Sequence, residues 1–168
     1  MFRESEKDRV NKLNTCLAKI LSGMKPPEDL TVSQWADKNR RLTSESSAEV
    51  GKWRTSRTPY MFDILDSFTD PLIEHIVVVA ASQVGKSETI NNMVGYCIDQ
   101  DPGPILLIQP TIDDVKRYSE MRIAPMIRET RCLKRKVADP KSRDAANTKR
   151  QKSFPGGVLV MTGSNVAH

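Results

Sequence analysis

The chain has 168 residues, of which 38% are hydrophobic, and a net charge of +5. This length allows one domain with a small appendage, and the apolar fraction excludes a wholly disordered chain. No apolar run approaches the roughly 20 residues that cross a bilayer, and the charged amino terminus lacks a signal-peptide pattern. The three cysteines (Cys16, Cys97 and Cys132) lack metal-ligand spacing, so we expect them to be reduced thiols of an intracellular protein. We expect no membrane partner.

The first 70 residues are predicted to be mainly helical. In residues 5–22, apolar side chains recur at three- and four-residue steps, which predicts an amphipathic helix. The apolar face of such a short helix must pack against its own domain or against a partner. A second helix begins after Thr31, which can form a capping box with Gln34, and runs to about Leu42. Residues 60–68 are predicted to form a third helix, closed by Asp70-Pro71.

The remainder predicts an α/β domain. The runs 76–80, 105–108 and 158–161 are apolar at every position, which is typical of strands buried on both faces of a parallel sheet. Helical patterns lie between them, at 88–98, 112–120 and 123–130. We therefore expect a parallel sheet flanked by helices over residues 51–168, preceded by a small helical segment over residues 1–50.

Positive charge is concentrated near the end of the chain. Residues 131–152 hold nine Lys and Arg against two Asp, a local charge of +7, so the remaining residues sum to −2. Such a segment can neutralise DNA phosphates and release counterions, but a solvated lysine-rich loop has the same composition. Charge alone does not decide between the two.

A phosphate-binding turn is predicted between the first strand and its helix. The pattern is that of a P-loop, G-x-x-x-x-G-K-[S/T], with Ala80 in place of the first glycine. Backbone amides of the turn and helix start would hold phosphates, Gly85 would permit their close approach, and Lys86 would bind the β- and γ-phosphates of ATP. The Ser87 hydroxyl would hold Mg²⁺. The alternative is a plain helix entry, and the predicted strand–turn–helix context favours nucleotide binding by Ser82, Gln83, Val84, Gly85, Lys86, Ser87 and Glu88.

Several motifs together resemble the large terminase subunit of lambda-like phages. They are Thr31-Val-Ser-Gln-Trp35-Ala-Asp37, Gly51-Lys-Trp53, Thr58-Pro59-Tyr60 and Ala81-Ser-Gln-Val-Gly-Lys-Ser-Glu88, followed by Gln109-Pro110-Thr111 and Gly156-Gly157. The resemblance covers roughly residues 30–168 and includes the order and spacing of these pieces.

The resemblance implies a P-loop ATPase that uses ATP and Mg²⁺ to drive double-stranded DNA through a portal into a procapsid, in the host cytoplasm. A carboxy-terminal endonuclease domain belongs to the full-length family. The resemblance also implies that residues 5–22 dock the small terminase subunit and that Trp53, Arg54 and Tyr60 contribute to the adenine site. Core packing is the alternative for Trp53 and Tyr60.

Two departures from the family pattern affect catalysis. Ser82 and Gln83 stand where some terminases carry an arginine, so a catalytic arginine must come from elsewhere. The resemblance places the Asp-Glu pair that serves Mg²⁺ and the attacking water shortly beyond His168. We therefore expect the nucleotide-binding first part of the ATPase, truncated before the Walker B acid, with no complete catalytic set and an open sheet edge that favours self-association.

Two other functions stay open from the sequence. The chain could be a small protein that imitates the front of a terminase and captures the small subunit, in which case residues 1–25 would carry its activity. It could instead be a helicase-like P-loop NTPase, because Gln109-Pro110-Thr111 follows a predicted strand. That function would show a preference for single-stranded DNA.

Overall fold

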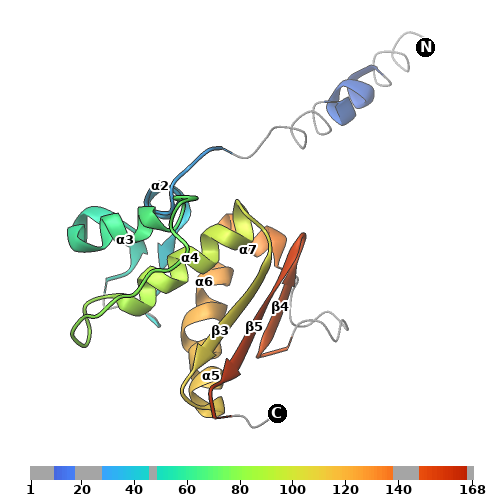
Figure 1. The fold of residues 1–168 in the computed structure, drawn as a ribbon. Helices are drawn as coiled ribbons and strands as arrows, with labels where there is room; N and C mark the ends of the chain where they lie inside the picture. The colour runs from blue at the N-terminus through green and yellow to red at the C-terminus, as the bar shows by residue number, and fades with distance from the viewer. Residues whose placement is uncertain (1–9, 18–27, 46–48, 138–147, 166–168) are drawn as a thin grey trace.

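The amino-terminal part consists of short helices and a two-stranded ribbon (Figure 1). The computed structural model describes residues 10–17, 28–45, 49–137 and 148–165. Residues 10–17 are helical, as predicted, and the rest of the predicted 5–22 helix lies outside the described residues. The elements that follow are α2 (Val32–Asn39), β1 (Arg41–Leu42), β2 (Gly51–Lys52), η1 (Thr55–Arg57), η2 (Pro59–Met61) and α3 (Phe62–Ser67).

Helix α2 begins as predicted and ends earlier. The Thr31 hydroxyl accepts a hydrogen bond from the Gln34 N–H, and the Gln34 side chain accepts one from the Thr31 N–H, which confirms the capping box. The helix stops at Asn39 because Arg40 is extended and Arg41–Leu42 pair antiparallel with Gly51–Lys52. Arg41 and Leu42, which were predicted to be the last residues of the helix, instead form strand β1 of the ribbon.

The second part of the chain is an α/β unit with a mixed sheet. Its sheet has the strand order β3-β5-β4, in which β3 and β5 are parallel and β4 is antiparallel to β5. The predicted strands at 105–108 and 158–161 are confirmed, but the purely parallel sheet is wrong. Strand β4 was not predicted and begins at the end of the basic segment. It forms a hairpin with β5 through Gly156, whose φ of 86° suits glycine. The elements are α4 (Lys86–Asp99), β3 (Pro104–Gln109), α5 (Ile112–Tyr118), the π-helical turn η3 (Ser119–Ile123), α6 (Ala124–Glu129), α7 (Arg131–Lys136), β4 (Gln151–Phe154) and β5 (Gly157–Gly163).

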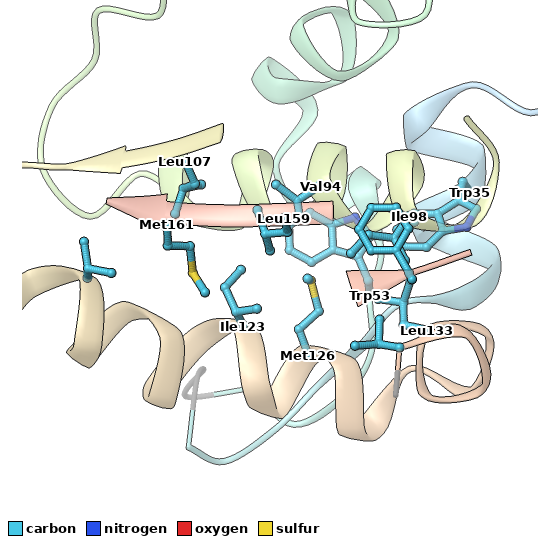
Figure 2. Close-up of a cluster of buried hydrophobic side chains, with 14 residues drawn as sticks. Trp35, Trp53, Val94, Ile98, Leu107, Ile123, Met126, Leu133, Leu159 and Met161 are labelled. Atoms are coloured by element: carbon cyan, nitrogen blue, oxygen red, sulfur yellow. The ribbon is translucent and has the colours of Figure 1, made fainter. Parts of the chain in front are cut away.

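The core lies between the sheet and the helices on one of its faces (Figure 2). On the other face, the side chains of Leu106 and Ile108 in β3 are 62% and 56% exposed. Burial on both faces was therefore wrong for β3 among the described residues. The labelled core residues in Figure 2 are Trp35, Trp53, Val94, Ile98, Leu107, Ile123, Met126, Leu133, Leu159 and Met161.

The predicted strand over 76–80 is not formed. These residues form neither a helix nor a strand, and within the described part of the chain no strand pairs with them. Val77 and Val79 are 84% and 94% exposed, whereas Ile76 and Val78 line an apolar hollow of about 480 Å³ beside α3 and α4. The exposure alternates as in an extended chain, but a strand also needs hydrogen-bonding neighbours. The apolar, β-branched composition correctly predicted an extended backbone, but composition does not show whether a neighbouring strand is available for pairing.

Within the described ranges, no helix combines the length and apolarity needed to span a membrane. The three cysteines are free thiols, as predicted. Burial raises the pKa of Cys97 to about 11 and that of Cys132 to about 12, so both stay protonated at neutral pH.

The contact between Trp35 and Gly95 gives a test of this packing. A Cβ on Gly95 would lie 2.4 Å from the buried Trp35 ring, so we expect Gly95→Ala to lower the free energy of unfolding by about 1–3 kcal/mol. The clash outweighs the gain of about 1 kcal/mol in helix propensity. Urea unfolding measures the difference. Gly103→Ala is the control, because its Cβ would meet nothing within 4 Å. Equal stability of the Gly95 variant and the wild type would contradict the packing.

Candidate functional site

The turn before α4 has the backbone geometry of an anion site. Gln83 and Gly85 adopt left-handed conformations, with φ of 61° and 90°. The Gly85 carbonyl accepts the first bonds of the helix, from the N–H groups of Glu88 and Thr89 at 3.0 Å each. The N–H groups of Lys86 and Ser87 precede these bonds and lie at the open amino end of the helix. Amides at such a turn and helix start form a concave site that attracts anions.

Lys86 lies over this turn. Its ammonium Nζ donates hydrogen bonds to the carbonyl oxygens of Ala80 and Ala81, at 2.6 and 2.7 Å. No carboxylate of the described residues forms an ion pair with it. A phosphate oxygen is a stronger acceptor for an ammonium than a carbonyl oxygen is, because it carries charge. Lys86 is therefore placed where an incoming phosphate could replace one of these carbonyls.

A second hollow, of about 260 Å³, lies beside the turn. We call it the basic hollow, because Lys52, Arg54 and Arg57 line it. Two acids line it as well: Glu88, and Glu49, which pairs with Arg57. The Tyr60 hydroxyl donates a hydrogen bond to the Val84 carbonyl at 3.2 Å, which ties its wall to the turn. The structure thus brings the predicted adenine-site residues next to part of the predicted phosphate-binding set. The full lining is Leu42, Glu49, Lys52, Trp53, Arg54, Arg57, Thr58, Tyr60, Gln83, Val84, Gly85 and Glu88.

The predicted site residues differ in exposure. Trp53 is 7% exposed and belongs to the core, so the core-packing alternative applies to it even though its edge reaches the basic hollow. Tyr60 is 58% exposed, and Arg54 is also exposed, so neither is a core residue. Ser82 and Ser87 are exposed residues of the turn and helix start, outside the lining of the basic hollow. Lys86 lines the apolar hollow and not the basic hollow.

The wall that carries Trp53 is fixed by Asp37 of α2. Asp37 Oδ1 accepts hydrogen bonds from the Thr55 N–H at 2.6 Å and the Thr55 hydroxyl at 3.0 Å. The Trp53 Nε1–H in turn donates to the Thr55 hydroxyl at 3.0 Å. The Trp-Ala-Asp motif therefore has a structural role, because Trp35 enters the core and Asp37 orders the edge of the basic hollow.

Glu88 forms a polar cluster that the sequence did not predict. Its carboxylate contacts Arg40 Nη2 at 2.6 Å and Arg122 Nη1 at 3.2 Å, and it accepts from Asn91 Nδ2 at 3.2 Å. The Tyr118 hydroxyl donates to Asn91 Oδ1 at 2.7 Å. Burial lowers the pKa of Arg40, partly opposed by Glu88, and burial also raises the pKa of Tyr118. An acid directly after Gly-Lys-Ser signals a need for counter-charge, but the sequence does not say which arginines provide it.

The donors at the helix start suit Mg²⁺ bound together with phosphates. Ser87 offers a hydroxyl beside Lys86 at the exposed amino end of α4. In the described segments, no group of three His, Cys, Asp or Glu side chains could hold a metal by itself. Mg²⁺ commonly keeps waters and phosphate oxygens and takes only one or two protein ligands, which fits this sparse donor set.

Comparison with known proteins gives consistent matches. The relatives include the large terminase subunit of Escherichia phage lambda, 28% identical over 121 residues, or 72% of this chain and 19% of the relative. The large terminase subunit of Enterobacteria phage P21 is 27% identical over 132 residues, or 79% and 20%. This chain thus spans about a fifth of the length of these curated relatives, and no solved structure matches it significantly. The family model described as "Phage terminase large subunit gpA, ATPase domain" matches residues 47–168, so the chain belongs to this family of terminase large subunits.

Proposed function

We propose that the chain is the nucleotide-binding first part of a DNA-packaging motor ATPase that moves double-stranded DNA into a procapsid. One observation carries this proposal. The residues that match the ATPase-domain family contain a turn whose amides open at the start of α4, with Lys86 over it. The division into a docking segment over residues 1–50 and a P-loop ATPase part over 51–168 belongs to the same proposal, as do a portal partner, self-association and the host cytoplasm.

In this proposal the triphosphate of ATP lies at the turn and the nucleoside lies in the basic hollow. Backbone amides of residues 83–87 bind phosphate oxygens, and Lys86 exchanges a carbonyl of Ala80 or Ala81 for the β- and γ-phosphates. Tyr60 and Arg54 line the adenosine side. Ser87 would hold Mg²⁺, which neutralises phosphate charge when it is bound.

Removal of the Lys86 ammonium tests the nucleotide site. We expect Lys86→Ala to weaken binding of a fluorescent Mg·ATP analogue at least roughly tenfold, because charge-assisted bonds to two phosphates are lost. Equilibrium titration measures the affinity, and circular dichroism checks the fold. Lys116→Ala is the matched control, since Lys116 is an exposed lysine paired with Asp113 at 3.0 Å on α5. Unchanged affinity of the Lys86 variant would refute the assigned site.

We propose that the exposed basic residues of α7 contact DNA phosphates. Arg131, Lys134 and Arg135 are exposed on this short helix. Other charges of the basic segment are engaged within the chain: Lys136 pairs with Asp99 at 2.9 Å, and Lys149 with Glu120 at 2.6 Å. The basic segment therefore has fewer Lys and Arg side chains free for DNA contact than its composition alone suggests.

Salt dependence of DNA binding tests these contacts. Each phosphate contact adds about 0.9 to the slope of log affinity against log salt, so replacement of Arg131, Lys134 and Arg135 by Gln should lower the slope by up to about 3. Fluorescence anisotropy with a labelled duplex at several salt concentrations measures it. The control variant, Lys116→Gln with Arg117→Gln, removes two exposed charges of α5. The same slope in the α7 variant and the wild type would rule out α7 as the contact.

The helix over residues 10–17 supports a docking role for the amino terminus. Its apolar residues Val10, Leu13 and Leu17 are 51%, 62% and 47% exposed, so the described part of the chain does not cover them. We propose that they bind the small terminase subunit. The same observation favours a second candidate function, a separate interaction module that captures this subunit without serving a motor.

Deletion of residues 1–25 separates docking from nucleotide binding. We expect the shortened chain to lose binding of the purified small terminase subunit and to keep its affinity for Mg·ATP, because residues 83–88 lie in a different part of the chain. Pull-down and nucleotide titration on the same preparation measure both. Retained capture of the small subunit would contradict docking. If the 168-residue chain captures the small subunit but does not bind ATP, the interaction module is favoured over the motor.

A further inference from the structure

Glu88 places a negative charge where an anionic ligand is expected. Its side chain is 13% exposed, lies in the first turn of α4 and lines the basic hollow together with Gly85. A carboxylate is attracted to the amino end of a helix by the same partial charges that attract phosphates. An uncompensated carboxylate would therefore compete with the ligand for these charges and also repel it.

Two arginines from distant parts of the chain compensate this charge. Arg40, at the end of α2, contacts Glu88 Oε2 at 2.6 Å, and Arg122, in the π-helical turn η3, contacts Oε1 at 3.2 Å. The three side chains together carry a net charge of +1. Local π-helical turns occur frequently at functional sites, and here the turn brings Arg122 to the start of α4.

Arg40 is committed to this role by its burial. Its side chain is 1% exposed and its Nε has no hydrogen-bond partner among the described residues. Its Nη1 donates to the neighbouring Arg41 carbonyl at 2.5 Å, and Glu88 is the carboxylate that pairs with it. Replacement of a buried ion pair by apolar groups is often neutral or stabilising, so stability alone does not explain why the chain carries this one.

We infer that Arg40 is a positioning residue for nucleotide binding, which holds and neutralises the Glu88 carboxylate so that the start of α4 can accept a triphosphate. Arg122 supplies the second counter-charge. Arg40 acts through Glu88 rather than on the ligand, and it lies outside residues 47–168 that match the ATPase-domain family. The inference rests on the proposed nucleotide site and adds that α2 sets the affinity of that site.

A double-mutant cycle tests the inference. In the full 168-residue chain, we expect Arg40→Met to weaken binding of a fluorescent ATP analogue about tenfold or more, because the Glu88 charge loses its main partner. The loss should be smaller for the ADP analogue, which carries less charge. Glu88→Gln alone should tighten ATP binding, since the cluster charge rises from +1 to +2. Arg40→Met with Glu88→Gln should return the affinity to within about threefold of the wild type.

A structural role of Arg40 would give a different pattern. Equal losses for ATP and ADP, or no rescue by Glu88→Gln, would overturn the inference, and so would full affinity of the Arg40→Met chain. If Arg40→Met fails to fold, Arg122→Met carries the same cycle, because the Arg122 side chain is 38% exposed. Arg117→Met, an arginine that is 68% exposed and pairs with Asp114, is the matched control.

The Lys86→Ala chain separates the two proposals. If the wild type binds ATP in a Lys86-dependent way but the cycle shows no rescue, the positioning role fails and the nucleotide site stands. If the wild type shows no Lys86-dependent binding, the nucleotide site fails and the role of Arg40 falls with it.

Discussion

Helix α4 is held at both ends by α2, and this constraint positions the candidate site. At its carboxyl end, the Trp35 ring packs against Gly95, and the Trp35 Nε1–H donates to Asp99 Oδ2 at 2.8 Å. At its amino end, Arg40 pairs with Glu88. Because the first contact buries a whole indole and the second a whole guanidinium, α4 has little freedom to rotate or slide. The turn that carries Gly85 and Lys86 therefore has a defined place beside the basic hollow.

The electrostatics of this region match an anionic ligand better than they serve stability. The rim of the basic hollow carries the exposed residues Lys52, Arg54 and Arg57, and also Glu49, which pairs with Arg57. The rim therefore keeps a net charge of +2, and exposed ion pairs contribute little to the free energy of unfolding. The Glu88 cluster adds one further positive charge below the rim. Charges collected around a concave surface raise the local concentration of anions. A nucleotide at the turn would meet this field, the open amides and Lys86 at the same place.

The sequence predicted local features well and the sheet only in part. The capping box of Thr31 and the strands at 105–108 and 158–161 followed from neighbouring residues, and all are present. The helix predicted over 88–98 is also present, and it begins two residues earlier, at Lys86. The prediction of a strand at 76–80 was wrong, because composition indicates an extended chain but does not show whether a neighbouring strand pairs with it. The family resemblance implied that Tyr60 contributes to the adenine site, but the hydrogen bond from Tyr60 to Val84 was not predicted. The pairing of Arg40 with Glu88 joins residues 48 apart and could not be chosen among many arginines without the fold.

The most direct test of the account is residue-resolved NMR of the chain titrated with a non-hydrolysable Mg·ATP analogue. The account predicts that the largest changes in amide chemical shift occur at residues 83–88, with a second group around Arg54 and Tyr60, because phosphates would bind the amides of the turn and the nucleoside would enter the basic hollow. Saturable changes confined to other parts of the chain, with the amides of 83–88 unaffected, would contradict it.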